Sequence, residues 1–328
     1  MKIRWGILGV AKINERLLPG FAKARNADLR AIASRSLARA QAAAKAAGIP
    51  AAHGSYEALL DDPEIDAVYI PLPNHLHGEW TRKAADRGKH VLCEKPLTPT
   101  AAESRQVVNY CRSKGVFLMD GFMWPHHPRT HQLKKFLTDG GIGRITQVNA
   151  AFTFMLDLDP ENIRLNAASA GGSLLDVGCY PVFGIRWAFA AEPLSAWATA
   201  TMQNGVDLRL SGVLKFSDNR TATFDCGFTL PFRGWMEIAG AEGTVRLPDM
   251  WLPPDPAIYE IERDRGQIET VSVAGHDQIV HMIEDFGDAI MEKREPQPSA
   301  EEAIKTNRVM DALAGSAREG REIAIGQT

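Results

Sequence analysis

The sequence predicts an α/β protein made of a doubly wound parallel sheet followed by an α+β domain whose large open sheet is mostly antiparallel. Two observations predict this division. As far as residue 123, short apolar runs alternate with helical patterns, whereas beyond it strand-like runs with period-two alternation follow one another with few helices. Because 328 residues suffice for about two domains, we place them at residues 1–123 and 124–328, with the last helices able to pack back on the first domain.

The first domain is expected to alternate strands and helices, which gives a parallel sheet covered on both faces. Gly48 can end the second helix as its C-terminal cap, and Thr100 with Glu103 fits a capping box at the start of the fourth. The expected strands are Ile3–Leu8, Leu29–Ala33, Ala67–Leu72, His90–Cys93 and Val116–Asp120, and the expected helices are Ile13–Ala24, Leu37–Ala47, His77–Arg87 and Ala101–Lys114.

The second domain is expected to be rich in strands that have one apolar face. An open sheet has two faces, and few helices are available to cover them, so we expect a second subunit to bury the other face in a homodimer or homotetramer. The expected strands are Thr146–Phe154, Ala196–Met202, Asp207–Phe216, Thr221–Phe228, Trp235–Ala239 and Ala257–Arg263, and the expected helices are Thr130–Leu137, Gln278–Glu292 and Ala300–Ala317.

Composition excludes several classes of protein. The chain is 45% hydrophobic and 23% charged with a formal net charge of −3, so it has no basic surface for nucleic acid or an anionic membrane. Its cysteines, Cys93, Cys111, Cys179 and Cys226, have neither Cys-x-x-Cys nor Cys/His ligand spacing, so no metal site is expected. Lys2 leads straight into a strand and no apolar run approaches 18 residues, so we expect a cytoplasmic enzyme.

The stretch Val91-Leu92-Cys93-Glu94-Lys95-Pro96 is the centre of the functional prediction. An apolar run that ends in a charged pair and a proline is typical of a buried parallel strand reaching the sheet edge where ligands bind. Pro96 keeps Lys95 out of the α region, and the bond between them can be cis or trans. Glu94 and Lys95 are therefore candidate cofactor contacts, although a strand-end lysine can also be a solvated surface charge.

The turn after the first strand partly matches the dinucleotide fingerprint G-x-G-x-x-G. Gly9 falls on its first glycine, Ala11 on the second and Asn14 on the third. Gly9 can still make the tight turn, and the start of the helix, with Ala11, Lys12 and Ile13, can still offer backbone amides to a pyrophosphate. A strand-to-helix turn without a ligand is the alternative.

The end of the second strand favours NADP over NAD. An NAD site places a carboxylate there for the ribose 2′-hydroxyl, yet no acidic residue occurs between Asp28 and Glu57. Arg35 takes that place, where its guanidinium can bind the 2′-phosphate of NADP, and Ser34 and Ser36 can add hydrogen bonds. The alternative is an exposed arginine before a helix.

Residues after the strand that ends near Leu72 are further cofactor candidates. Pro71, Pro73, Asn74 and His77 follow that strand at the carboxyl edge, where they would line the cofactor crevice, although a polar helix cap would look the same. His75 and His77 lack a carboxylate partner nearby in sequence, so we do not predict a metal site.

Together these motifs resemble the Gfo/Idh/MocA family of oxidoreductases. The Ser-Arg and Gly-Cys-Tyr-Pro motifs are most similar to its NADP-dependent dihydrodiol and D-xylose dehydrogenase branch. The resemblance extends over essentially the whole chain and implies an N-terminal Rossmann domain that binds NADP. The segments that carry it are Gly6-x-x-Gly9, Ala33-Ser34-Arg35, Pro73-Asn74-x-x-His77, Glu94-Lys95-Pro96, Phe122-Met123-Trp124, His127-Pro128, the run from Ala170 to Pro181, and Arg318-Glu319-Gly320.

The resemblance also implies that Lys95 is catalytic and that Asp176 and Tyr180 face it. Residues four apart share one face of a helix, but Ser173-x-x-Asp176 also fits a capping box, which would make Asp176 a helix-start residue only. A phenol needs a nearby cation to exchange a proton near neutral pH, and Lys95 would provide one. Otherwise Tyr180 is a buried tyrosine whose hydroxyl has some other partner.

Candidate substrate contacts are Trp124, His127, Phe154, Arg164 and Asn166, together with Asp176 and Tyr180. Their aromatic rings would suit the apolar face of a sugar or cyclic diol. Arg164 corresponds to an arginine in similar dehydrogenases, and its simplest alternative is a surface salt bridge with Glu161 or Asp159.

The sequence therefore predicts an NADP(H)-dependent oxidoreductase acting on an alcohol carbon of a sugar, polyol or cyclic trans-diol. Lys95 and Tyr180 would handle the hydroxyl proton. Two alternatives stay open: a sugar–sugar oxidoreductase that retains its NADP, and a non-catalytic protein that senses NADP or sugar.

Overall fold

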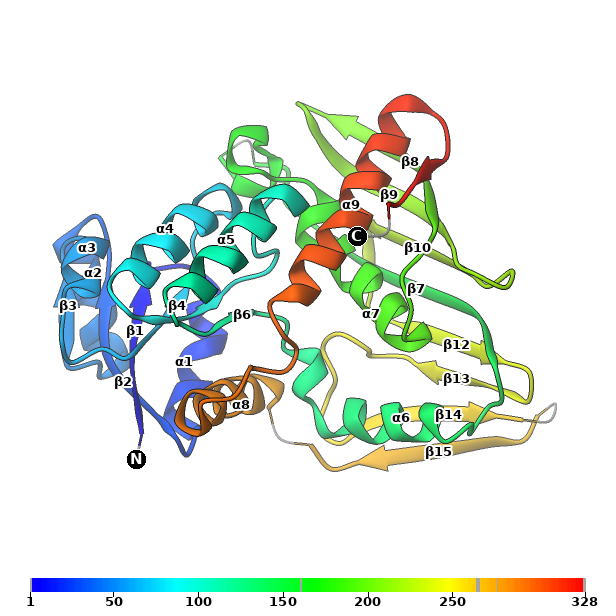
Figure 1. Cartoon of the computed structure of the whole chain (residues 1–328), viewed down its shortest axis with the longest axis horizontal. Coiled ribbons are helices and arrows are strands. Elements are labelled where there is room, and N and C mark those ends of the chain that lie inside the picture. The colour runs from blue at the N-terminus through cyan, green and yellow to red at the C-terminus, as the bar shows by residue number, and fades with distance from the viewer. Residues whose placement is uncertain (1, 160, 264–265, 276, 327–328) are drawn as a thin grey trace. The chain divides into compact units, whose positions relative to one another are not determined.

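The computed structural model describes residues 2–159, 161–263, 266–275 and 277–326. It divides into two compact units, and each is considered by itself (Figure 1). Unit 1 comprises residues 1–126 with 277–304, and unit 2 comprises residues 127–276 with 305–328. None of the helices in the described ranges is both long and apolar enough to cross a membrane.

Unit 1 contains a six-stranded sheet in which every pairing is parallel. The strand order β3-β2-β1-β4-β5-β6 is that of a doubly wound Rossmann sheet, so the predicted fold class is confirmed. The strands are β1 (Ile3–Leu8), β2 (Ala27–Ala33), β3 (Ala51–His53), β4 (Ala67–Ile70), β5 (His90–Cys93) and β6 (Leu118–Asp120).

Helices pack on both faces of this sheet and bury two apolar clusters. Gly48, at φ +67°, ends α2 as predicted, and the Thr100 hydroxyl accepts the Glu103 N–H at 3.3 Å to start α5. The sequence missed β3 and α3 because elements of three and five residues are too short for hydrophobic periodicity to show. The helices are α1 (Asn14–Lys23), α2 (Leu37–Ala47), α3 (Tyr56–Leu60), α4 (Asn74–Asp86), α5 (Ala101–Ser113) and α8 (Gln278–Glu292).

Unit 2 contains a ten-stranded sheet in the order β15-β14-β13-β12-β7-β10-β9-β8-β16, with β11 added beside β7. Every pairing is antiparallel except that of β7 with β10, so the mostly antiparallel open sheet is also confirmed. The strands are β7 (Ile145–Met155), β8 (Ser195–Gln203), β9 (Val206–Lys215), β10 (Thr221–Gly227), β11 (Thr229–Arg233), β12 (Met236–Gly240), β13 (Gly243–Leu247), β14 (Ala257–Glu262), β15 (Ile268–Val273) and β16 (Ile323–Ala324).

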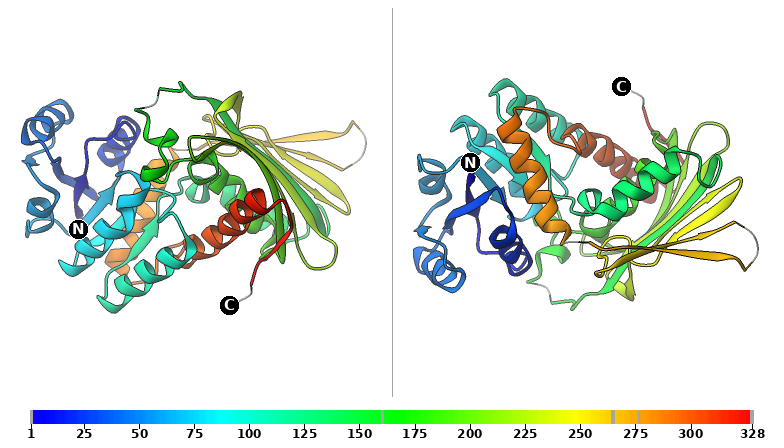
Figure 2. Two further views of the ribbon diagram at one scale, coloured as in Figure 1. Left: turned by 90° about the horizontal axis from the view of Figure 1, so that it is seen from above. Right: turned by 90° about the horizontal axis from the view of Figure 1, so that it is seen from below.

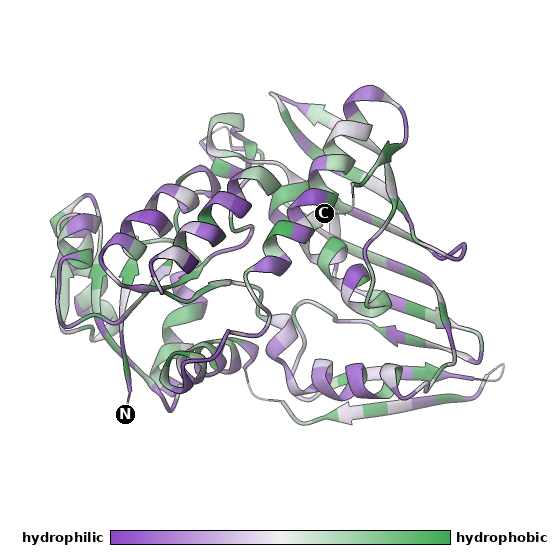
Figure 3. Cartoon of the chain, viewed as in Figure 1, coloured by the Kyte–Doolittle hydropathy of each residue, from purple (hydrophilic) through white to green (hydrophobic). Residues whose placement is uncertain are grey.

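Three helices cover one face of this sheet: α6 (Pro128–Thr138), α7 (Cys179–Phe189) and α9 (Glu301–Glu319), of which α9 begins in unit 1 and ends in unit 2. The Phe136 ring of α6 lies 6.5 Å from the Tyr259 ring of β14. Gly184 of α7 and Gly212 of β9 allow close packing, because a Cβ there would lie within 3 Å of Trp251 and of Leu313, respectively. Figure 2 shows the helices on this face and the opposite face open, and Figure 3 shows hydropathy alternating along the strands.

Candidate active site

The turn between β1 and α1 in unit 1 is shaped to approach a ligand. Gly9 has φ +135°, a conformation that favours glycine. Asn14 is buried, and its side-chain amide donates to the Gly9 carbonyl oxygen at 2.9 Å, so an asparagine fastens the turn where the fingerprint has its third glycine. Within the described residues, the N–H groups of Ala11, Lys12 and Ile13 have no backbone acceptor, and they can therefore hydrogen-bond a pyrophosphate.

The ends of β1 and β2 lie side by side at the carboxyl edge of the sheet, because Leu8 pairs with Ala33. Arg35 follows directly and is exposed. The neighbouring Ser34 is buried, and its hydroxyl oxygen accepts the Ser36 N–H at 3.3 Å. Arg35 is thus accessible to a ligand, while the oxygen of Ser34 is already used as an acceptor within the turn.

His77 links the loop after β4 to the loop after β5. Pro71 is buried, and Pro73 and Asn74, which begin α4, are partly exposed at the carboxyl edge. The His77 ring is fully buried, with Nδ1 2.9 Å from the Pro96 carbonyl oxygen and Nε2 2.6 Å from that of Leu72. Desolvation by burial lowers the pKa of His77. Both nitrogens are therefore engaged with the backbone, and the ring joins the loop after β4 to the loop that carries Lys95.

Lys95 follows the end of β5 with its side chain partly buried, and the Lys95–Pro96 bond is cis. The adjacent Glu94 carboxylate accepts the Tyr69 hydroxyl of β4 at 2.6 Å. This contact fixes Glu94 from the neighbouring strand. The segment around Lys95 is therefore held by Tyr69 on one side and by His77 on the other.

Asp120 is a buried acid near Lys95 that was not among the predicted site residues. It ends β6 and pairs in register with Cys93 of β5. Burial raises the pKa of Asp120 well above its usual value, the charge of Glu94 raises it further, and Lys95 lowers it. The signal that could have found it is its position, because Asp120 ends an apolar run at the same sheet edge as Lys95.

In unit 2, Asp176 and Tyr180 lie on one helical segment that begins with a π-helical turn, Leu174–Gly178, and continues as α7. The alternative of a Ser173–Asp176 capping box is wrong. The Ser173 hydroxyl donates to Asp207 at 2.6 Å, and the Leu174 N–H donates to the same carboxylate oxygen at 2.8 Å. Asp207 of β9 therefore caps this segment, a tertiary contact that no local spacing could reveal.

The capping contact of Asp207 needs a glycine at position 172, so a substitution there tests the contact. Its φ is +110°, and a Cβ would lie 2.3 Å from a carboxylate oxygen of Asp207. Gly172→Ala is expected to destabilise the fold by about 3 kcal/mol, from backbone strain plus the displaced cap. Gly48→Ala is the control, because Gly48 also has positive φ but a Cβ there would have no neighbour within 4 Å. Urea unfolding measures both, and equal losses would mean that Asp207 does not clamp the segment.

Asp176 is held by Arg164, whose Nε donates to the Asp176 carboxylate at 2.7 Å. The expected alternative, a surface salt bridge of Arg164 with Glu161 or Asp159, is therefore not what forms. The Arg164 backbone also packs tightly on the turn before the π-helix, since its carbonyl oxygen accepts the Gly172 N–H at 2.9 Å. Arg164 is 41% exposed in its side chain against 15% for Asp176, so the guanidinium covers the carboxylate from the solvent side.

The Tyr180 ring is packed edge-on against two aromatic rings. Phe152 of β7 lies 5.0 Å away and Trp251 lies 5.8 Å away, measured between ring centroids. The Trp251 indole N–H donates to the Ala151 carbonyl oxygen at 2.8 Å. Tyr180 is only 4% exposed, so its ring orientation is fixed by packing. Phe152 and Trp251 were not among the predicted site residues, because their contact with Tyr180 joins residues far apart in sequence.

The remaining candidate substrate residues differ in accessibility. Trp124 and His127 are buried, and His127 Nδ1 accepts the Arg129 N–H at 3.0 Å at the start of α6. Phe154 is partly exposed and packs 5.3 Å from Phe228. Asn166 is exposed, with its side-chain oxygen 2.8 Å from the Ala168 N–H. Phe154 and Asn166 are thus the more accessible pair.

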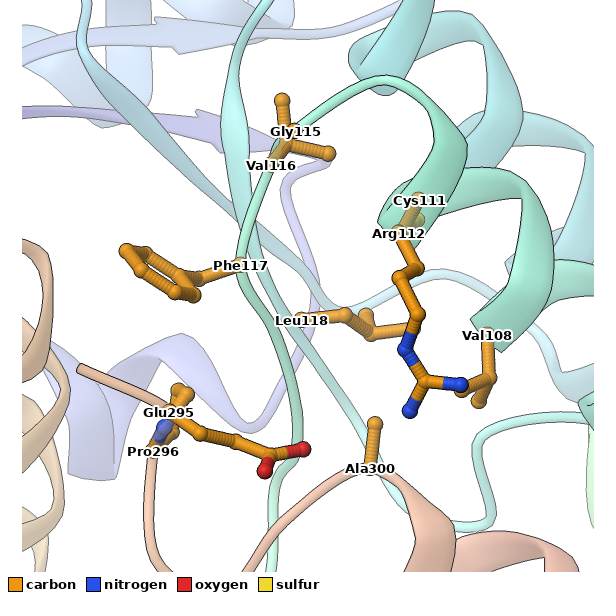
Figure 4. A pocket seen from close by; sticks show the side chains of 10 residues that line it. All are labelled: Val108, Cys111, Arg112, Gly115, Val116, Phe117, Leu118, Glu295, Pro296 and Ala300. Carbon is orange, nitrogen blue, oxygen red and sulfur yellow. The ribbon is translucent and has the colours of Figure 1, made fainter. Parts of the chain in front are cut away.

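Unit 1 also has a hollow of about 260 Å³ beside the start of β6. It lies between the end of α5 and the segment that joins α8 to α9, beside the start of β6 (Figure 4). The Arg112 guanidinium at its rim donates to Glu301 at 2.9 Å. The hollow is therefore at the opposite end of the strands from Lys95. The described residues include no group of three or more His, Cys, Asp or Glu side chains that could hold a metal ion.

Comparison with known proteins identifies the family. Residues 3–122 match the model described as "Oxidoreductase family, NAD-binding Rossmann fold", and residues 130–246 match the GFO/IDH/MocA C-terminal domain. D-xylose 1-dehydrogenase (NADP(+)) 2 of Haloferax volcanii is 39% identical over 324 residues, covering 98% of this chain and 99% of that enzyme. The chain belongs to the Gfo/Idh/MocA family.

Other Gfo/Idh/MocA members add to this finding. Trans-1,2-dihydrobenzene-1,2-diol dehydrogenase of Xenopus tropicalis is 31% identical, covering 80% of this chain and 81% of that enzyme. A 3-ketoreductase from Actinomadura kijaniata, solved in complex with NADP and TDP-benzene, is 31% identical with a TM-score of 0.90, covering 96% of this chain and 98% of that one. That ketoreductase has also been solved with a tyrosine replaced by phenylalanine and with a lysine replaced by alanine.

Proposed function

We propose that this chain is an NADP(H)-dependent oxidoreductase that transfers hydride to or from an alcohol carbon of a sugar, polyol or cyclic trans-diol. The observation that carries the proposal is a pair of features, one in each unit. Unit 1 has a dinucleotide turn with Arg35 in place of a carboxylate, and unit 2 has Asp176 and Tyr180 on a clamped segment. Similarity to an NADP-dependent xylose dehydrogenase over almost the whole chain supports it.

The residues of unit 1 fit NADP. The Gly9 conformation and the amides of Lys12 and Ile13 suit a pyrophosphate, and an exposed Arg35 in an acid-free stretch suits a 2′-phosphate. Pro73, Asn74, Glu94 and Lys95 lie at the same carboxyl edge, where the nicotinamide half would bind. When bound, NADP supplies the hydride acceptor or donor.

We propose that Lys95 and Tyr180 act together on the substrate hydroxyl. In oxidation the phenol oxygen takes the hydroxyl proton, and in reduction the phenol returns a proton to the developing alkoxide. The Lys95 ammonium hydrogen-bonds the substrate oxygen and favours the ionised phenol. Asp176, fixed by Arg164, would orient the substrate. The lysine and tyrosine variants of the related ketoreductase concern the same two residue types.

The proposed function is tested with a panel of pentoses, hexoses and trans-diols, followed at the absorbance of the reduced nicotinamide. Turnover that is faster with NADP than with NAD is expected. NADPH binding without turnover of any member would favour the sensing protein instead. Ping-pong kinetics with NADP retained on purification would favour the sugar–sugar oxidoreductase.

We further propose that the open face of the unit 2 sheet joins two copies of the chain. One row of outward side chains crosses seven strands in register: Trp197, Val213, Thr223, Asn149, Glu237, Arg246 and Glu260. Trp197 is 42% exposed. Because aromatic residues are enriched in protein interfaces, an exposed tryptophan next to Val213 on this open face favours an interface there.

Trp197→Glu tests this assembly. The variant is expected to sediment as a monomer under conditions in which the native chain sediments as a dimer or larger, because a charge would be buried without a partner. Leu37→Glu is the control, since Leu37 is similarly exposed on α2 of unit 1. Analytical ultracentrifugation gives the masses. A native chain that is already monomeric, or a Trp197→Glu variant of unchanged mass, would contradict the proposal.

A further inference from the structure

Asp120 is a buried acid that takes no part in the proposed proton transfer. It ends β6 and pairs in register with Cys93, the last residue of β5. The next residue is packed closely against β5, since the Gly121 N–H donates to the Cys93 carbonyl oxygen at 2.7 Å. A Cβ on Gly121 would lie 2.8 Å from that oxygen and 3.2 Å from the Cα of Glu94. Asp120 therefore lies directly beside the segment that carries Glu94 and Lys95.

The surroundings of Asp120 favour its neutral form. The residue is 9% exposed, and its Oδ1 has no hydrogen-bond partner among the residues that the structure describes. An ionised carboxylate oxygen that is buried without a donor is unfavourable, and protonation removes most of that cost. Burial raises the pKa of Asp120 well above its usual value, although backbone hydrogen bonds from Gly121 and from Leu97 in the Lys95 loop, residues 95–97, lower it.

Glu94 is the better place for a negative charge. It is partly exposed, and its Oε1 accepts the Tyr69 hydroxyl at 2.6 Å, a hydrogen bond that becomes stronger when the acceptor is ionised. After burial, the charge of Glu94 is the next cause that raises the pKa of Asp120. Two carboxyl groups that share one site do not both ionise readily. Of this pair, Asp120 is therefore the one that keeps its proton.

Other titratable groups face Asp120 or the Lys95 loop. Cys93 is fully buried on β5, and burial raises the pKa of its thiol well above the usual value, so it stays neutral. His77 contacts the loop from α4, and burial lowers its pKa. The charge of Lys95 lowers the pKa of Asp120, but less than burial and Glu94 raise it. Lys95 thus supplies positive charge beside the pair of acids, and Glu94 supplies negative charge.

We propose that Asp120 is a neutral acid that positions the Lys95 loop and leaves the Lys95 ammonium balanced by Glu94 alone. This inference rests on the proposed function, in which that ammonium stabilises the substrate oxygen. A second carboxylate beside Lys95 would oppose the negative charge that develops on the substrate oxygen, whereas a neutral acid does not. Asp120 is therefore a positioning residue, and it acts through its hydrogen bonds to the loop and through its lack of charge.

Infrared difference spectroscopy on the full chain tests the protonation and does not require turnover. Near neutral pH, Asp120→Asn is expected to lose the band of a protonated carboxyl group, identified by its shift in D₂O. Asp61→Asn is the control, because Asp61 is exposed and pairs with Arg87, so this variant should lose carboxylate bands only. Glu94→Gln removes a charge that raises the pKa of Asp120, so the protonated band should disappear at a lower pH than in the native chain.

Kinetics with a substrate of the panel test the positioning. Asp120→Ala removes the acceptor for the Leu97 N–H, so it is expected to lower kcat at least about tenfold while the KM for NADPH changes less than about threefold. Asp120→Asn keeps a neutral acceptor of the same shape, so it should recover kcat to within about threefold of the native value. The pH profile of kcat in Asp120→Asn should coincide with that of the native chain.

Several results would overturn the inference. One is the loss of a carboxylate band in Asp120→Asn. Another is a pH profile displaced to lower pH by about one unit, because the substitution would then have removed a negative charge beside Lys95. Equal kcat in the Asn and Ala variants, or a protonated band that does not respond to Glu94→Gln, would also overturn it. A protonated band with the expected response, in a chain that turns over no sugar or diol, would leave Asp120 a neutral acid while the proposed activity failed.

Discussion

Lys95→Ala is expected to lower kcat about 10²- to 10³-fold, because it removes the donor and the positive charge that would stabilise the developing alkoxide. The affinity for NADPH should change little, since the phosphates are expected to bind the turns after β1 and β2. Steady-state kinetics with the best substrate of the panel gives kcat, and quenching of protein fluorescence gives NADPH binding.

The comparison for Lys95 is Lys83→Ala. Lys83 lies on α4 of the same unit and pairs with Glu79 at 2.7 Å on the surface. Lys83→Ala should leave kcat within about twofold of the native value, since surface ion pairs of this kind contribute little to stability. Lys95→Arg adds a second comparison, because it keeps the charge with a different donor geometry. A Lys95→Ala enzyme with nearly native kcat would remove Lys95 from the reaction.

Tyr180→Phe is expected to lower kcat about 10²- to 10⁴-fold by removing the group that is proposed to exchange the hydroxyl proton. The fold should be almost unaffected, because phenylalanine keeps the ring contacts with Phe152 and Trp251 and a single hydrogen bond contributes about 1 kcal/mol. Kinetics and urea unfolding measure the two effects. If Lys95 and Tyr180 act together as proposed, the pH dependence of kcat should also lose one ionisation.

Tyr259→Phe is the matched control for the phenol. Tyr259 is buried in β14 of the same unit, and burial raises the pKa of its hydroxyl. The substitution removes an equally buried hydroxyl without removing the proposed proton carrier, so kcat should stay within about threefold. Similar losses of kcat in both variants would mean that Tyr180 matters for packing alone.

Local sequence was sufficient to predict the strands and helices that carry the candidate residues of unit 1. The run Val91 to Cys93 followed by Glu94, Lys95 and Pro96 placed Lys95 after β5 at the sheet edge. Alternation of strands and helices predicted the parallel sheet, and Gly48 predicted the end of α2. These features depend on residues close in sequence, so periodicity and turn chemistry carry enough information to predict them.

In unit 2, the contacts of the helical segment that starts at Leu174 are made with residues far apart in sequence. A capping box from Ser173 to Asp176 was a reasonable local alternative, but Asp207, 34 residues away, takes the Ser173 hydroxyl. Similarly, Arg164 bonds Asp176 in preference to its neighbours Asp159 and Glu161. Several partners were chemically possible in each case, and the packing of β9 and of the Gly172 turn selected one.

By itself, the sequence determined the fold class and the family motifs, and it predicted candidate residues in each of the two units. Only the tertiary structure decided that Asn14 hydrogen-bonds the Gly9 carbonyl and that His77 links the loops after β4 and β5. It also decided that Asp120 is a buried acid near Lys95. The physical reason is that strand and helix patterns are encoded in neighbouring residues. The partner of a buried polar group is chosen by whichever distant element the fold brings within hydrogen-bond distance.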